Sequence, residues 1–338
     1  MEVTQDQTII YSLWSKFSNL KLIEIRKIPS GFKNRSFYVK SEDGNEYVLK
    51  IYAPKFLTKE QIEERAMIVK TLENQRLPVL EMIQGLNGKY TQEISGDSNT
   101  YYATLSKYVK VQFPEIIVNK DIITNLAKDL KRLHVELEKV TYDPNFKKLK
   151  RDYVSVFLAD DTLNLIKNHF NEKVGRTERL NEFLSFYVNE GEKLQDYFSK
   201  SETLFTSIQL NHGDFNLNNI FVENGETVRI FDFDEMVLAP KAWDLALTIY
   251  SLDYPEEFYT DELLQIFIEA YFEKSEITKE VILDIVQFMR YRAYNRIARY
   301  FTDFQFKENP GGHFTKFRRH LEKFNQIDVH EVYKLVTK

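Results

Sequence analysis

The sequence predicts an α+β fold in two parts, a sheet-based N-terminal part and a mainly α-helical C-terminal part. Short β-rich runs separated by turns occupy the first third of the chain. Beyond residue 109, apolar residues recur at the spacing of amphipathic helices. A chain of 338 residues is long enough for each part to have its own core. We therefore expect one domain at residues 1–107 and another at residues 108–338.

The N-terminal part is expected to contain a five-stranded antiparallel sheet and one long helix after its third strand. A stripe of apolar residues first predicts a helix at residues 5–17. Thr58 is placed to cap the long helix, which would run to about Gln75. A turn at residues 85–88 separates the last two strands. The predicted strands are residues 22–28, 35–40, 46–52, 79–84 and 101–108.

The C-terminal part is expected to be a set of packed helices. Leucines at positions 126, 130, 133 and 137 share one helical face and predict a helix at residues 121–138. A helical segment with a break near Gly175 follows, and three helical regions complete the chain. The broken segment is residues 152–198, and the three later regions are residues 260–274, 278–306 and 315–336.

Composition excludes several classes of function. Lys and Arg number 46 against 51 Asp and Glu, and this net charge of −5 predicts no general attraction to nucleic acid or anionic lipid. The absence of cysteine excludes disulfides and Cys-ligated zinc. No apolar run approaches the ~20 residues that cross a bilayer, and the acidic, polar N-terminus is unlike a signal peptide. We expect a cytoplasmic protein without nucleic-acid or membrane partners; the oligomeric state stays open.

The most informative stretch is residues 212–234, which begins His-Gly-Asp-Phe-Asn-Leu-Asn-Asn-Ile. Asp214 precedes Asn219 by five residues, and two short apolar runs then flank a turn at residues 223–226. Such a hairpin would bring Asn219 and Asp232 together at its open end. Carboxylate and amide oxygens are ligands that Mg²⁺ prefers, and Asp214 would stand nearby to orient a hydroxyl nucleophile. This arrangement is typical of phosphoryl transfer from a nucleotide.

The same stretch resembles the catalytic and metal-binding loops of the aminoglycoside phosphotransferase and choline kinase family. Asp232-Phe233-Asp234 stands where protein kinases carry Asp-Phe-Gly, and residues 239–246 resemble the next signature, whose aspartate, here Asp244, braces the catalytic loop. The resemblance implies a bilobal protein-kinase-like fold and a kinase that uses ATP and Mg²⁺. It implies that Asp214 is catalytic and that Asn219 and Asp232 bind the metal.

Lys50 lies in the middle of an apolar strand, where a buried ammonium needs a partner. The resemblance implies that Lys50 holds the α- and β-phosphates and pairs with a glutamate of the following helix. Glu64 is the expected partner, with Glu63 and Glu60 as alternatives.

Two further segments are expected at the nucleotide. The turn at residues 30–36 lies where the resemblance implies a phosphate-covering loop, with Gly31 and Asn34 as its matching residues. Leu105 and Lys107 belong to the connection after the fifth strand, whose backbone would bind adenine. GTP in place of ATP stays possible.

The acceptor is predicted only by class. Few residues separate Phe233 from the helix that contains Asp244, and no Ala-Pro-Glu motif follows. This leaves no room for a protein-kinase activation loop and favours a small-molecule hydroxyl acceptor. A protein serine/threonine kinase of the same fold and a nucleotide-binding pseudoenzyme or structural protein remain as alternatives. Four residues recur at helical spacing and would either bind an anionic acceptor or belong to a solvated helix with ion pairs: Arg292, Arg296, Arg299 and Tyr300.

Overall fold

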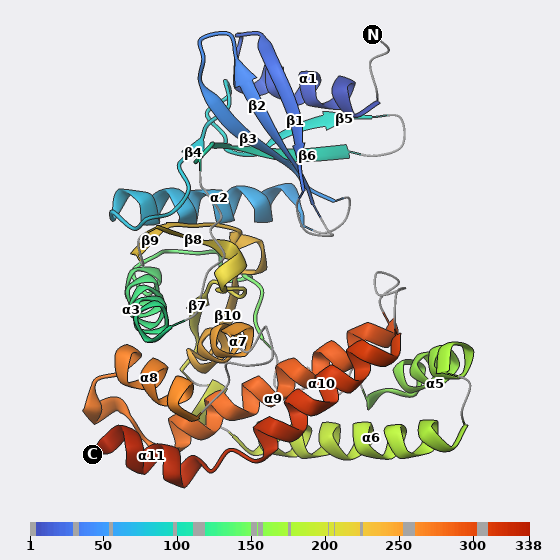
Figure 1. Cartoon of the computed structure of the whole chain (residues 1–338). Helices are drawn as coiled ribbons and strands as arrows, with labels where there is room; N and C mark the ends of the chain where they lie inside the picture. The colour runs from blue at the N-terminus through green and yellow to red at the C-terminus, as the bar shows by residue number, and fades with distance from the viewer. Residues whose placement is uncertain are drawn as a thin grey trace.

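The fold consists of a sheet-bearing lobe and a helical lobe (Figure 1). The computed structural model describes residues 5–29, 34–53, 57–96, 100–110, 119–149, 154, 158–174, 177–201, 203–205, 207–223, 226–252, 261–302 and 310–338. The antiparallel sheet of the first lobe and the helices of the second confirm the predicted bilobal α+β class.

The sheet has six antiparallel strands instead of the five expected. Its order is β1-β2-β3-β6-β4, and β5 pairs with β6 beside this path. Helix α1 (Gln5–Phe17) packs its buried Leu13 and Trp14 into the core that Leu49 and Leu105 share. The strands are β1 (Leu22–Ile28), β2 (Arg35–Ser41), β3 (Glu46–Ile51), β4 (Met82–Ile83), β5 (Gln92–Ser95) and β6 (Thr100–Lys107).

The strand predicted at residues 79–84 was wrong in extent, because β4 spans only Met82–Ile83. Val79 instead forms a parallel bridge with Ile230 of the helical lobe, and the Pro78 carbonyl accepts a hydrogen bond from Ile230 N at 2.6 Å. This backbone segment therefore pairs outside the sheet. The missed strand β5 has the sequence Gln-Glu-Ile-Ser, too polar to give an alternating apolar signal.

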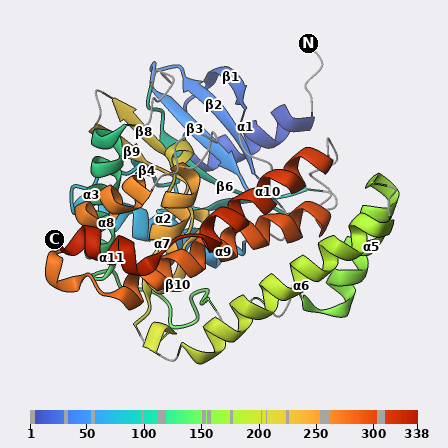
Figure 2. The same ribbon diagram turned by 60° about the horizontal axis from the view of Figure 1, so that its bottom comes forward.

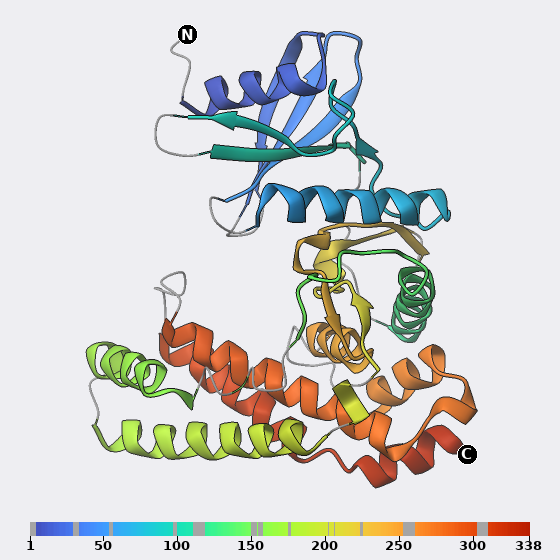
Figure 3. The same ribbon diagram turned by 180° about the vertical axis from the view of Figure 1, so that it is seen from behind.

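Helix α2 (Lys59–Asn74) lies between the sheet and the helical lobe (Figures 1 and 3). Thr58 caps it as predicted: its hydroxyl accepts from Gln61 N, and the Gln61 side chain accepts from Thr58 N. This reciprocal pair is a capping box, which satisfies two otherwise unpaired donors. The buried face carries five apolar residues and one arginine, Arg65.

The helical lobe is built around α9, against which α7 and α10 pack (Figure 2). Helices α5 and α6 flank one end of the α9–α10 pair. The region predicted at residues 315–336 is two helices, because Asp328 caps a new one by accepting from His330 N and Glu331 N. The helices are α3 (Lys120–Leu137), α5 (Asp160–Val174), α6 (Thr177–Lys200), α7 (Ala242–Leu252), α8 (Asp261–Tyr271), α9 (Lys279–Thr302), α10 (Pro310–Asn325) and α11 (Val329–Thr337).

Two small antiparallel pairs lie between α2 and these helices and carry the loops of interest. Strand β7 (Gln209–Asn211) pairs with β10 (Val237–Ala239), and β8 (Ile220–Glu223) pairs with β9 (Glu226–Ile230). The second pair confirms the predicted hairpin. Residues 212–219 lead from β7 into β8, and residues 231–236 lead from β9 into β10.

Candidate active site

The loop after β7, residues 212–216, is named the catalytic loop here, and residues 231–236 the metal loop. Gly213 of the catalytic loop lies against the backbone of the metal loop. Its φ of +83° is in the left-handed region that favours glycine. A Cβ at this position would lie 2.0 Å from the carbonyl oxygen of Glu235. Only glycine therefore allows the catalytic loop to lie directly against the backbone of the metal loop.

Asp214 is held by Asn219. The amide nitrogen of Asn219, at the end of the 3-10 turn η2 (Leu217–Asn219), donates to the carbonyl oxygen of Asp214 at 2.8 Å and to its Oδ2 at 2.9 Å. The other carboxylate oxygen, Oδ1, lies 3.7 Å from Nη2 of Arg292, and the Asp214 side chain is 33% exposed. The carboxylate is thus oriented and still accessible to a hydroxyl group.

The hairpin brings Asn219 and Asp232 together as the sequence predicts. Ile220 pairs with Ile230, and Phe231 N donates to the carbonyl of Asn219 at 3.0 Å, so Asp232 follows directly at the open end. Asp232 has φ 64° and ψ 61°, a left-handed conformation that is uncommon for residues other than glycine. Such conformations cluster at functional sites because the surrounding structure has to maintain them.

Lys50 of β3 forms an ion pair with each of two carboxylates of the metal loop. Its Nζ lies 2.8 Å from Asp232 Oδ1 and 2.7 Å from Asp234 Oδ2. Burial lowers the pKa of Lys50, but Asp234 and Asp232 outweigh it and hold that pKa well above its ordinary value. Burial raises the pKa of Asp234 and is not outweighed there. Burial also raises the pKa of Asp232, but Lys50, together with His212 and the hydrogen bond from Asp234, outweighs it and lowers that pKa. Three charges from both lobes are thus coupled.

The expected pairing of Lys50 with Glu64 was wrong for this structure. Glu64 Oε1 instead accepts from Asp143 N at 2.6 Å. Glu63 accepts from Tyr90 N and Thr91 N, and Glu60 is exposed. Glu63 and Glu64 are therefore bonded elsewhere and Glu60 is exposed, whereas Lys50 pairs with Asp232 and Asp234.

Asn34 reaches the metal loop, whereas Gly31 lies outside the described residues. The Asn34 amide nitrogen donates to Asp234 Oδ2 at 2.6 Å, and its oxygen accepts from Ala53 N at 3.0 Å. Leu105 is buried in β6 between β3 and β4, and Lys107 N donates to the Glu81 carbonyl at 2.9 Å. The nucleotide-binding roles of these residues stay predictions.

The backbone of the catalytic loop is fixed by a buried network around Asp244 of α7. The Asp244 carboxylate accepts from His212 N at 2.7 Å and from Gly213 N at 2.8 Å. His134 of α3 joins Asp244 to Tyr271 of α8, with its Nε2 3.1 Å from Asp244 Oδ2 and its Nδ1 2.6 Å from the Tyr271 hydroxyl. All these side chains are buried. Three helices therefore determine where Asp214 stands.

His212 is a structural member of the loop. Its Nδ1 accepts from Asp214 N at 3.3 Å, so its Nε2 carries the hydrogen donated to the Phe231 carbonyl at 3.2 Å. Burial lowers the pKa of His212 and outweighs Asp244 and Asp214, which raise it. Both ring nitrogens of a neutral His212 are thus used to connect the two loops.

Sequence reasoning missed Arg65 of α2. Its Nε donates to the Asp234 carbonyl at 3.1 Å and its Nη2 to the Met236 carbonyl at 3.3 Å. The guanidinium lies 4.8 Å from the centre of the Phe146 ring, and the residue is 5% exposed. The available signal was position: Arg65 falls on the apolar stripe of α2, three residues after Ile62.

The donor groups fit a hard divalent cation. Asp232 and Asp234 offer carboxylate oxygens, and the amide nitrogen of Asn219 is occupied by Asp214, which leaves its amide oxygen for a cation. The described residues hold no group of three His, Cys, Asp or Glu side chains that would bind a metal by themselves. The chain therefore suits a cation that takes its remaining ligands from phosphate and water, as Mg²⁺ commonly does.

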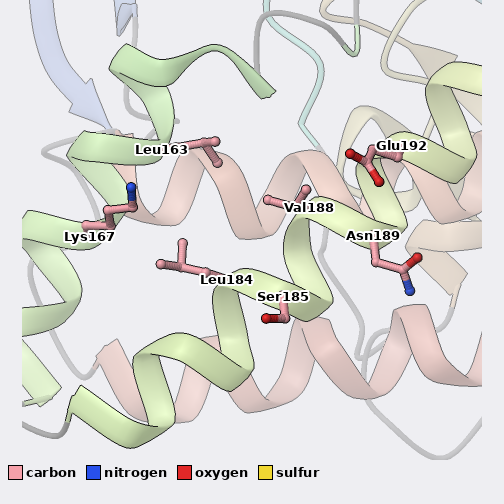
Figure 4. Close-up of a pocket in the computed structure, with 7 residues that line it drawn as sticks. All are labelled: Leu163, Lys167, Leu184, Ser185, Val188, Asn189 and Glu192. Carbon is pink, nitrogen blue, oxygen red and sulfur yellow. The ribbon is translucent and has the colours of Figure 1, made fainter.

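A separate hollow of about 400 Å³ lies between α5 and α6 (Figure 4). None of its lining residues belongs to the catalytic or the metal loop, so it is not where phosphoryl transfer would occur. It is lined by Leu163, Lys167, Leu184, Ser185, Val188, Asn189 and Glu192. In the part of the chain that the structure covers, no helix is both long and apolar enough to span a bilayer.

Comparison with solved structures places the fold. Amicoumacin kinase hAmiN, solved with AMP-PNP, Ca²⁺ and Ami, superimposes with a TM-score of 0.74 at 15% identity over 97% of both chains. A microcompartment-associated aminopropanol kinase gives 0.73 at 14% identity over 98% of this chain and 99% of that one. Choline kinase from Cryptosporidium parvum gives 0.64 at 14% identity over 99% and 100%. At such identities the likeness shows the fold.

The family follows from the sequence itself. A search of curated proteins gave no match. The model of the Phosphotransferase enzyme family (APH), however, matches residues 24–280, which include β3, the catalytic loop and the metal loop. The match confirms the resemblance on which residues 212–234 were interpreted. The chain belongs to the phosphotransferase enzyme family and is a phosphotransferase with a protein-kinase-like fold.

Proposed function

We propose that the protein is a Mg²⁺-dependent kinase that transfers the γ-phosphate of ATP to a hydroxyl group of a small-molecule acceptor. The observation that carries this proposal is the convergence of Asp214, Asn219, Asp232 and Lys50 from both lobes. Residues 1–107 would bind the nucleotide, with contacts from Gly31, Asn34, Leu105 and Lys107, and residues 108–338 the acceptor. We also propose a cytoplasmic location, where ATP and Mg²⁺ are available.

Each charged group has a separate task in this proposal. Mg²⁺ bound at Asp232 and Asn219 would neutralise charge on the β- and γ-phosphates. Lys50 would bind phosphate oxygens, because its raised pKa keeps it protonated. Asp214 would accept a hydrogen bond from the acceptor hydroxyl and direct its oxygen at the γ-phosphorus. Phosphoryl transfer depends mainly on such alignment and charge neutralisation.

The short connection between the metal loop and α7 favours a small-molecule acceptor. After the turn η3 (Phe233–Glu235) only the three-residue strand β10 precedes α7. All of these residues are described, β10 is buried, and the stretch is too short for the activation loop of a protein kinase. A protein serine/threonine acceptor therefore has less support, and a nucleotide-binding pseudoenzyme is disfavoured by the complete set of charged groups.

Asp214→Asn tests the proposal. The amide keeps the shape of the side chain but loses the charge that attracts the hydroxyl proton. We expect turnover to fall about 10²–10⁴-fold with ATP affinity nearly unchanged. The measurement is ADP release with Mg²⁺-ATP across amino alcohols, aminoglycosides, polyols, hydroxy acids and protein substrates, paired with a binding titration of ATP.

The outcomes separate the three candidate functions. The proposal is supported if wild type releases ADP with a small acceptor and Asp214→Asn loses this activity. Transfer confined to protein substrates replaces it with the protein kinase. Nucleotide binding without transfer to any acceptor supports the pseudoenzyme. The same assays with GTP show which of the two nucleotides the protein uses.

A further inference from the structure

Three arginines of α9 have different environments. Arg290 is paired with Glu190 of α6 at 3.1 Å and with the side chain of Gln287 at 2.9 Å, so it is a structural arginine between helices. Arg292, two residues later, lies on a different side of the helix because successive residues turn by about 100°. Its Nη2 is 3.7 Å from Oδ1 of Asp214, and its side chain is only 20% exposed.

Arg296 lies one turn beyond Arg292 on the same side of α9, since residues four apart stack on one face. It is partly buried. Among the described residues it has neither an ion pair nor a hydrogen bond, in contrast to Arg290. An arginine on a solvated helix normally lies exposed or is paired with an acid. Arg296 is neither.

The local charge next to Asp214 is therefore positive on the side of α9. One carboxylate oxygen of Asp214 is used by Asn219, and the other faces Arg292. A cationic amine beside the reacting hydroxyl would be repelled by the guanidinium of Arg292, and Arg296 lies one helical turn further along α9. A carboxylate or phosphate would instead find a guanidinium fork, which binds both groups in a bidentate way.

On this basis, and resting on the kinase function proposed above, we propose that the acceptor carries an anionic group, a carboxylate or phosphate, which Arg296 and Arg292 bind while Asp214 orients the hydroxyl. The substrate class is then a hydroxy acid or a sugar phosphate, and Arg296 is a specificity-determining residue. In the transfer, the hydroxyl oxygen forms the new bond to the γ-phosphorus as the bond to the ADP oxygen breaks. The hydroxyl proton leaves through Asp214.

The experiment compares acceptors matched in size and different in charge. Glycerate, glycerol and 3-amino-1,2-propanediol share a hydroxylated three-carbon frame, and wider sets of hydroxy acids, sugar phosphates, polyols and amino alcohols extend each class. ADP release with Mg²⁺-ATP is measured for wild type, Arg296→Met and Arg296→Lys. We expect activity in the anionic class. Arg296→Met should raise the KM of the acceptor about 10–100-fold, the effect of one charge-assisted hydrogen bond.

Two comparisons keep this result specific. Lys279→Met removes a charge from the same helix at an exposed position beside Tyr333 and should leave the acceptor KM unchanged. Arg296→Lys keeps the charge and should recover part of the acceptor KM. In all variants the KM of ATP should stay constant, which a general loss of structure would not allow.

Three results would overturn the inference. Acceptors found only among amino alcohols or aminoglycosides would refute it while the kinase function stands. An unchanged acceptor KM in Arg296→Met would also refute the role of Arg296. If the protein binds Mg²⁺-ATP but releases no ADP with any class of acceptor, both the inference and the kinase function are refuted.

Discussion

At the scale of single residues, the ionisation of Asp232 and Asp234 is set by opposing effects. Burial favours the neutral form of each, and Lys50 favours the charged form. The balance lowers the pKa of Asp232 and raises that of Asp234. Two neighbouring carboxylates that share one lysine therefore contribute to stability with opposite dependence on pH.

The pH dependence of stability tests this assignment. Because the folded pKa of Asp232 lies below its unfolded value, its contribution is complete above about pH 5 and is lost as pH falls through the folded pKa, below about pH 4. The difference in free energy of unfolding between wild type and Asp232→Asn should be about 1 kcal/mol at neutral pH and should shrink with acid. Denaturant unfolding at several pH values measures it.

Asp234→Asn is the matched control for this experiment. Its raised folded pKa means that its ionised form is the costly one, so the wild type should gain from protonation of Asp234 as pH falls. The difference between wild type and this variant should change in the opposite direction. The assignment would be contradicted if the difference in free energy of unfolding from wild type changed with pH in the same direction for both variants.

At the scale of elements, α2 is connected to the metal loop through Arg65. The arginine donates to the carbonyls of Asp234 and Met236, on either side of Glu235. It thereby fixes backbone that carries both carboxylates paired with Lys50. Displacement of α2 would therefore move the metal loop as well.

Arg65→Met keeps much of the aliphatic stem and removes both hydrogen bonds to the metal loop, together with the one to the Gln61 carbonyl. Because it leaves two buried carbonyl oxygens without this donor, we expect the free energy of unfolding to fall by about 2–4 kcal/mol. The Mg²⁺ concentration for half-maximal nucleotide binding should also rise, since the metal loop loses its support. Lys70→Met on the same helix, where Lys70 pairs with Glu73, is the control and should change neither quantity much. Normal Mg²⁺ dependence in Arg65→Met would contradict this coupling.

At the scale of the whole molecule, nucleotide binding should stabilise both lobes together. A ligand that binds only the folded state at 100 times its Kd adds about 2.7 kcal/mol. For a chain of this size we expect AMP-PNP with Mg²⁺ to raise Tm by roughly 5 °C. Asp232→Ala should lose this rise, because it removes a proposed metal ligand and a partner of Lys50. Scanning calorimetry measures both, and an equal rise in the variant would exclude Asp232 from the metal site.

The sequence predicted most of the backbone of the site and fewer of its side-chain partners. The hairpin that joins Asn219 to Asp232 followed from local turn chemistry and apolar runs, which are short-range features. The pairing of Lys50 depended instead on how α2 is rotated against the metal loop. Adjacent residues on a helix point in directions about 100° apart, and Arg65 faces that loop where Glu64 was expected to reach Lys50.

The strand predicted at residues 79–84 was too long for a related reason. Residues 79–84 have the composition of a strand, but Val79 pairs with Ile230 across the lobes, and tertiary pairing of this kind has no local signature. Arg292 was noted for its spacing, whereas its contact with Asp214 depends on the placement of α9. Long-range arrangement was the missing information in both cases.

The bridge between Val79 and Ile230 has a consequence for how the chain comes apart. The two lobes are joined by backbone hydrogen bonding at Pro78 and Ile230 as well as by the covalent connection between β6 and α3. Arg65 and Lys50 add further contacts across the same boundary. A single protease cut between β6 and α3 should therefore leave a nicked protein whose two fragments travel together in gel filtration and separate only in denaturant.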